Sequence, residues 1–150
     1  MIVKTVTAPK NMVKDFSDAL IGLECTKIDH PSDWYWQIVF GDSKVTFGLE
    51  CPWRLLLNGS IKFGHEDHAQ IFGLPKPIDG PQRCLDILGT SCVVTAVLSP
   101  STSDVSISFD NGAQLQIFNF SCGYEGWSCS FSGLELIAMG GGELATTERV

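Results

Sequence analysis

A chain of 150 residues is long enough to bury one hydrophobic core and suits a single domain. Hydrophobic residues make up 44% of the chain and charged residues 18%, a balance that excludes an intrinsically disordered protein. The formal net charge of −7, with no basic patch interleaved with aromatic residues, argues against nucleic-acid binding.

An edge strand and a short helix are predicted at the N-terminus. Residues 2–7 alternate between apolar and polar side chains, as a strand does. Residues 9–20 carry an apolar stripe at helical spacing, with Pro9 suited to the first turn and Gly22 placed just after the end. Because the helix is short, we expect packing to stabilise it.

Two hairpins follow the helix. The segments 34–40 and 44–49 each place alternate apolar side chains on one face, and the Gly-Asp-Ser sequence between them predicts a tight turn. The Asn-Gly dipeptide within residues 54–64 predicts a second hairpin with a two-residue turn.

A helical crossover is predicted over residues 64–86. Prolines and glycines interrupt this segment, and short helical turns are expected at about 66–72 and from Pro81. The segment keeps apolar side chains that require burial, so it is expected to connect parts of one domain. Strands are predicted again over residues 90–98, 105–109, 113–120, 127–131 and 134–139.

The two halves of the chain repeat one plan, over about residues 20–63 and 87–139. In each half a Gly-x-x-Cys sequence precedes an Ile-x-Phe strand, a turn and an alternating strand that ends near a cysteine. We therefore expect a mainly β (α+β) fold in a single domain spanning residues 1–150. Two repeated antiparallel β-meanders would form a sandwich or a half-barrel, with the short N-terminal helix and the helical crossover attached.

The sequences CPWRL (51–55) and CGYEGW (122–127) occupy equivalent corners of the two repeats. Their aromatic side chains are expected to cap the core at strand ends. Arg54 and Glu125 are expected to form an ion pair near the pseudo-symmetry axis. The residues assigned this structural role are Trp53, Arg54, Tyr124, Glu125 and Trp127.

His65 and His68 form the strongest candidate pair for a metal ion, because their spacing places both on one face of a helix. A zinc site usually needs a third ligand, and His30, the remaining histidine, has no motif around it. The alternative is a polar helix start, in which Glu66 and Asp67 favour the N-terminal dipole. The expected outcome is no metal site and no cofactor.

Catalytic motifs are absent from the sequence. No Gly-x-Ser-x-Gly elbow occurs, and the glycines at 140–142 are followed by Glu143, which would repel phosphate. The four tryptophans could line a ligand cage, although their strand-like spacing favours the core. We therefore expect a protein that is not an enzyme, and a small-molecule-binding β module remains the alternative to a protein-binding role.

Charge is distributed unevenly along the chain. Residues 1–83 contain nine Lys or Arg and ten Asp or Glu, whereas residues 84–150 contain one and seven. The second part should attract a basic partner, or its acidity serves solubility alone. The six cysteines form no Cys-x-x-Cys pair and are expected to be free thiols, most of them buried. Without a signal peptide or a membrane-spanning run, the expected location is cytoplasmic.

Short motifs along the chain resemble a family of small bacterial proteins. The matching stretches are Trp-x-x-x-Phe with a turn (36–40), Pro-Trp-Arg (52–54), Gly-Thr-x-Cys-Val (89–93), ISFDNGAQLQI (107–117), YEGW (124–127) and GGGEL (140–144). Over about residues 20–145 the chain resembles proteins encoded beside polymorphic toxins. These proteins are regarded as immunity proteins, including those of contact-dependent growth inhibition systems.

The resemblance implies a cytosolic, acidic and non-catalytic protein that binds a cognate toxin domain, often a basic nuclease. Such a protein covers the active site of the toxin or an adjacent surface. The resemblance carries over no catalytic residue, and no nucleic acid or membrane is expected as a partner. The acids expected to contact the toxin are Glu66, Asp67, Asp104, Asp110, Glu135 and Glu143.

Overall fold

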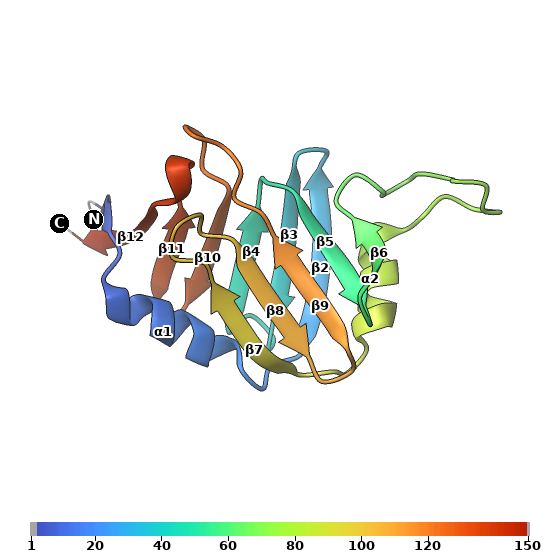
Figure 1. The fold of residues 1–150 in the computed structure, drawn as a ribbon, viewed down its shortest axis with the longest axis horizontal. Coiled ribbons are helices and arrows are strands. Elements are labelled where there is room, and N and C mark those ends of the chain that lie inside the picture. Colours follow the sequence, from blue (N-terminus) through green and yellow to red (C-terminus); the bar gives the residue numbers. More distant parts are fainter. Residues whose placement is uncertain (1–2, 150) are drawn as a thin grey trace.

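Two antiparallel β-sheets lie face to face in the computed structural model, which describes residues 3–149 (Figure 1). The larger sheet has the strand order β1-β12-β11-β10-β4-β3-β2, and the smaller has the order β6-β5-β9-β8-β7. The strands are β1 (Val3–Thr7), β2 (Cys25–Ser32), β3 (Tyr35–Phe40), β4 (Val45–Leu49), β5 (Trp53–Leu57), β6 (Ser60–Gly64), β7 (Val93–Leu98), β8 (Val105–Phe109), β9 (Ala113–Ile117), β10 (Trp127–Phe131), β11 (Leu134–Ala138) and β12 (Leu144–Arg149).

The fold is therefore mainly β and sandwich-like, as the alternating patterns predict, and it is not a closed barrel. Alternate residues of the strands point into the space between the sheets, where they form one continuous hydrophobic core. The predicted edge strand at 2–7 is observed as β1, although residue 2 lies outside the described residues. No helix in the described part of the chain is long and apolar enough to cross a membrane.

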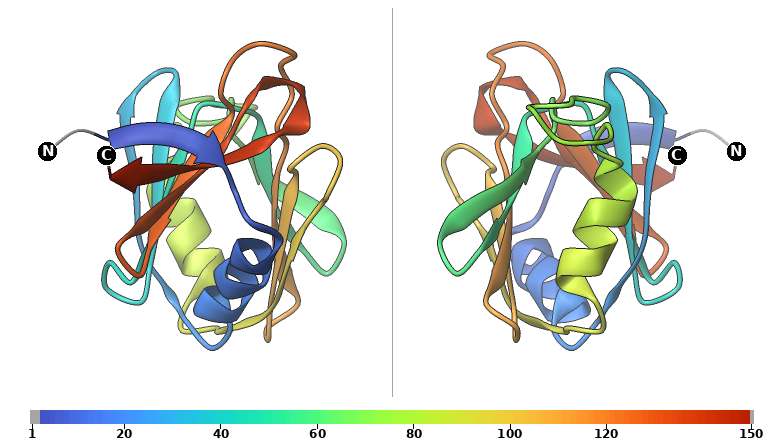
Figure 2. Two further views of the ribbon diagram at one scale, coloured as in Figure 1. Left: turned by 90° about the vertical axis from the view of Figure 1, so that its left-hand side faces the viewer. Right: turned by 90° about the vertical axis from the view of Figure 1, so that its right-hand side faces the viewer.

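Two helices close the two sides of the sandwich (Figure 2). Helix α1 (Lys10–Leu20) packs beside β7 and buries Phe16 and Leu20. Helix α2 (Gly80–Leu88) packs beside β2 and β6 and buries Cys84 and Leu88. Helix α1 matches the predicted apolar stripe, because an apolar face at helical spacing has a core to cover, and α2 begins at the predicted proline to within one residue.

The helix predicted at about 66–72 is wrong. Residues 65–79 form turns and extend away from the sandwich beyond β6 (Figure 1). Asp67 Oδ2 accepts a hydrogen bond from the Gly64 backbone N–H at 2.8 Å, and Ala69 and Phe72 have φ of 67° and 46°. A positive φ is incompatible with an α-helix, so the polar residues here stabilise turns.

The chain passes between the two sheets twice at one end of the sandwich. Strands β2–β4 belong to the larger sheet and β5–β6 to the smaller, whereas β7–β9 belong to the smaller and β10–β11 to the larger. The crossing segments, residues 50–52 and 118–126, lie side by side. The Glu50 N–H donates to the Gly126 carbonyl at 2.8 Å, and the Phe118 N–H donates to the Pro52 carbonyl at 2.9 Å. These crossings bring distant parts of the sequence to one end of the molecule.

Candidate binding site

Two adjoining pockets open at the end of the sandwich that contains the crossings. The histidine pocket, of about 450 Å³, includes all three histidines of the chain, with Trp34 and Trp36. The aromatic pocket, of about 690 Å³, includes Phe120 and Tyr124. The two pockets share Glu50 and Cys51, so they adjoin and together make one candidate site.

His30 forms the inner wall of the histidine pocket. Its ring stacks on Trp36, with ring centroids 3.8 Å apart, and meets the ring of His68 edge-on at 5.3 Å. His30 Nδ1 lies 2.9 Å from the carbonyl oxygen of Tyr35, which can only accept, so Nδ1 donates. Nε2 of the neutral ring is therefore a hydrogen-bond acceptor.

His65 and His68 have the opposite tautomer. His68 Nδ1 accepts from the backbone N–H of Gly80 at 2.9 Å, and His65 Nδ1 accepts from that of Trp53 at 3.4 Å. Each neutral ring must then carry its proton on Nε2, which is a donor and not a metal ligand. His65 Nε2 lies 3.5 Å from Glu66 Oε1.

The candidate metal pair, His65 and His68, has a different arrangement from the helical one considered for it. The predicted helical face is absent, and each of the two histidines supports a backbone group. In the described residues, no group of three or more His, Cys, Asp or Glu side chains is placed to hold a metal ion. His30, which has no motif around it, reaches His68 only because the fold places β2 beside the crossover.

Three aromatic side chains on loops are largely exposed at this end. Trp34 is 67% exposed, Phe120 76% and Tyr124 83%. Such exposure of large apolar side chains on one surface is typical of an interaction site, and Trp and Tyr are enriched among the residues that dominate binding energy.

The carboxylates are the acidic feature of the two pockets. Four carboxylates line the two pockets, and among residues 3–149 no Lys or Arg lines either of them. These carboxylates belong to Asp33, Glu50, Glu66 and Glu125. A partner with exposed basic residues would be attracted to this surface.

The structural role predicted for the residues at the two corners is only partly observed. Trp53 and Trp127 are buried, and Trp127 Nε1 donates to the Ser103 carbonyl at 2.8 Å. Tyr124 does not cap the core, because its side chain is largely exposed. Of the other tryptophans, Trp36 is buried and only Trp34 is exposed.

The predicted ion pair between Arg54 and Glu125 is wrong. Arg54 lies opposite Gln116 in the β5–β9 pair, and its Nε donates to Gln116 Oε1 at 2.6 Å. Its guanidinium also lies over the Phe118 ring, at 5.3 Å from the centroid. Glu125 is exposed on the second crossing, so Arg54 has a nearer partner on its own sheet.

The six predicted toxin-contacting acids do not gather on one surface. Asp67 caps Gly64, Asp104 Oδ1 accepts from the Asn119 N–H at 2.8 Å, and Asp110 Oδ1 accepts from the Cys92 N–H at 3.1 Å. Glu135 and Glu143 lie beside separate hollows elsewhere. Glu66 is the member that belongs to the two pockets described above.

Sequence reasoning missed Asp33 and Glu50 as site residues, and it considered Trp34 only with the other tryptophans as part of a ligand cage. Asp33 and Trp34 form the β2–β3 turn, and Glu50 begins the first crossing. An exposed tryptophan beside an acid in a turn is a signal that could have identified two of them. Comparison of the chain with protein-family models, with curated proteins and with solved structures finds no match in any of the three.

Proposed function

We propose that the protein is a non-catalytic immunity protein that acts in the cytoplasm. In this proposal it binds and neutralises a cognate bacterial toxin domain, a basic nuclease being the first candidate. The observation that carries the proposal is the candidate site at the crossings, where three exposed aromatic side chains adjoin four carboxylates and no described Lys or Arg lines the two pockets.

The chemistry of this site suits a basic protein partner. Exposed Trp34 and Tyr124 can become buried anchors in an interface, and each such anchor can contribute more than about 2 kcal/mol to binding. The carboxylates around them would accelerate association with a positively charged surface and discriminate against acidic proteins. The same charge disfavours nucleic acid as a direct ligand.

We also propose that the two halves of the chain are structural repeats. In both halves a helix is followed by three strands of one sheet and then by strands of the other, which are β5 and β6 in the first half and β10, β11 and β12 in the second. This shared order supports the repeat that the Gly-x-x-Cys and Ile-x-Phe sequences indicate. It would make the two crossings equivalent and would place the binding site where the repeats meet.

Co-expression with the product of the neighbouring upstream open reading frame tests the proposed function. We expect that product to be toxic alone, to co-purify with this protein and to lose its toxicity in its presence. A harmless neighbour that does not co-purify would refute the immunity function.

Matched variants test the proposed surface. Trp34→Ala and Tyr124→Ala should each weaken toxin binding at least about tenfold, and Glu125→Gln should mainly slow association. Asp15→Asn removes an exposed acid on α1 and should leave binding unchanged. If Glu143→Gln weakens binding while the two aromatic variants do not, the contact surface lies elsewhere on the molecule.

A small-molecule-binding β module is the second candidate. The observation that favours it is the histidine pocket, whose donors, acceptor and tryptophans could orient a ligand. Quenching of tryptophan fluorescence by a ligand, abolished in Trp34→Phe and retained in Trp127→Phe, would support this candidate over protein binding.

A further inference from the structure

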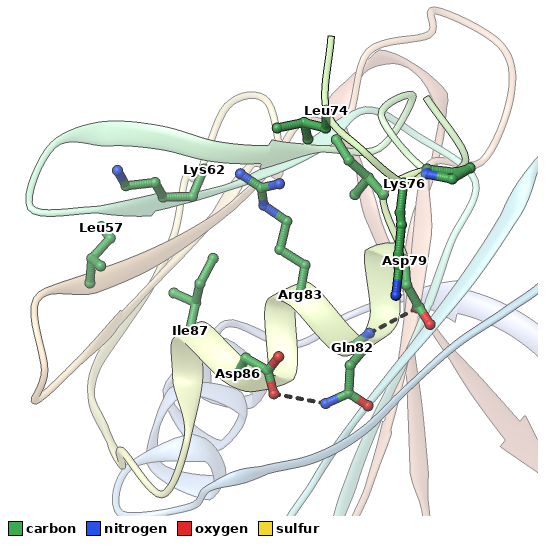
Figure 3. A pocket seen from close by; sticks show the side chains of 11 residues that line it. Leu57, Lys62, Leu74, Lys76, Asp79, Gln82, Arg83, Asp86 and Ile87 are labelled. Carbon is green, nitrogen blue, oxygen red and sulfur yellow. Dashed lines mark hydrogen bonds between the residues drawn. The ribbon is translucent and has the colours of Figure 1, made fainter. Parts of the chain in front are cut away.

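A separate groove of about 540 Å³ lies between the β5–β6 hairpin, the crossover and α2 (Figure 3). We call it the cationic groove. It shares no residue with the histidine and aromatic pockets. Much of its lining is apolar, and the side chains that form this part come from Leu57, Leu74, Pro77, Ile78 and Ile87.

Three cationic side chains also line this groove, although the protein has a net charge of −7. They belong to Lys62 on β6, Lys76 on the crossover and Arg83 on α2. Of the ion pairs found among the described side chains, none includes any of these three residues. With Asp79 and Asp86 also in the lining, the groove has an excess of one positive charge, and its three cations are not held in ion pairs with any described side chain.

The two aspartates of the groove are engaged by Gln82. Asp79 Oδ1 accepts from the Gln82 backbone N–H at 3.1 Å, which caps the N-terminus of α2. Asp86 Oδ1 accepts from Gln82 Nε2 at 2.7 Å (Figure 3). Arg83, between them in sequence, has neither carboxylate as a partner.

Arg83 is the central polar group of the groove. Its side chain is half-buried and extends from α2 toward the crossover and β6, with Leu74 beyond its tip (Figure 3). Within the described residues, its guanidinium donates no hydrogen bond. A planar guanidinium with free N–H groups is suited to a carboxylate, which can accept two parallel hydrogen bonds.

We propose that the cationic groove binds a small amphiphilic carboxylate. The carboxylate bonds to Arg83, Lys76 adds electrostatic attraction, and the apolar body packs against Ile78 and Ile87. A purely apolar ligand would leave the guanidinium without an acceptor. A small inorganic anion would leave the apolar lining exposed to water.

The test uses octanoate as the probe and nuclear magnetic resonance of the whole, ¹⁵N-labelled protein. Octanoate should shift the amide signals of Leu74, Ile78, Arg83 and Ile87 and should bind at least about tenfold more tightly than 1-octanol or acetate. Equal binding of octanoate and octanol, shifts confined to the crossing end, or no shift at millimolar octanoate would each overturn the proposal.

Variants identify the group that holds the carboxylate. Arg83→Gln should weaken octanoate binding about tenfold and leave octanol binding unchanged, whereas Lys10→Gln on α1 should change neither. Unchanged octanoate binding in Arg83→Gln would overturn the proposal. If Arg83→Gln does not fold, Lys76→Gln applies the same test, because Lys76 is exposed on the crossover and its loss should weaken octanoate selectively.

Discussion

Phe16 of α1 stacks on Trp127 of β10, with ring centroids 5.9 Å apart and ring planes inclined by 26°. The same phenylalanine meets Phe47 edge-on at 5.8 Å and Phe131 at 6.1 Å. Phe16 has no exposed surface. One side chain therefore joins the N-terminal helix to strands from both halves of the chain.

Truncation of the Phe16 side chain should destabilise the whole fold. We expect Phe16→Ala to lower the free energy of unfolding by about 3–5 kcal/mol, because it removes a buried aromatic ring and leaves a cavity. Urea denaturation followed by circular dichroism measures the change. Lys14→Ala, on the exposed face of the same helix, should change stability by less than about 0.5 kcal/mol. Similar values for the two variants would mean that α1 contributes little to the core.

The start of α2 depends on a glycine for a steric reason. A Cβ at Gly80 would lie 2.6 Å from Phe63 Cζ and 3.0 Å from Trp36 Cη2, both in the buried core. Gly80→Ala should therefore lower the free energy of unfolding by about 1–3 kcal/mol through overpacking. Gly123→Ala is the matched control, because a Cβ there meets no atom within 4 Å. A Gly80→Ala melting temperature equal to that of the control would contradict the clash.

The hairpins could be predicted from the sequence because their signals are local. Asn58 and Gly59 adopt φ of 49° and 83°, the left-handed conformations that this dipeptide favours, and the turn joins β5 to β6 as expected. The apolar stripe of α1 is likewise a property of consecutive residues. Residue propensity and apolar periodicity are sufficient to predict an element whose contacting residues are also close in sequence.

The binding site could not be predicted in the same way. Its aromatic pocket exists because β4 pairs with β10 and β5 with β9, and these pairings join residues from different halves of the chain. Alternation defines which face of a strand is buried but not which strand lies beside it. The meeting of Glu50 with the second crossing follows from those pairings, whereas His30 meets His68 because β2 lies beside the crossover.

His68 should contribute to stability through Nδ1, which accepts a hydrogen bond from the Gly80 N–H. His68→Phe would leave the Gly80 N–H without its partner and should cost about 1–3 kcal/mol of stability. His68→Asn can offer Oδ1 in place of Nδ1, so we expect it to retain most of that stability. Amide hydrogen exchange at Gly80 distinguishes the two, with faster exchange in the phenylalanine variant only. Equal exchange rates in both variants would show that loss of the hydrogen bond to Gly80 does not cause the loss of stability.

The free thiols differ sharply in environment. Cys122 is exposed on the second crossing, whereas Cys25, Cys51, Cys84 and Cys129 are buried. Burial raises the pKa of Cys25 from 9.0 to about 12, and it also raises the pKa of Cys84 and Cys129 well above the usual range. These groups hold their protons in the folded state under conditions in which an unfolded chain loses them.

Cys51 allows the effect of a buried thiol on the pH dependence of stability to be tested. Burial, together with the charges of Asp104 and Glu50, raises its pKa from 9.0 to about 12. Above pH 9 the folded protein binds more protons than the unfolded chain, so stability falls as pH rises, by up to about 1.4 kcal/mol per pH unit for this thiol. Urea denaturation at increasing pH should therefore show a shallower loss of stability in Cys51→Ala than in the unmodified protein. Cys122→Ala, which removes an exposed thiol, should keep the original slope, and identical slopes in all three proteins would contradict a buried, protonated Cys51.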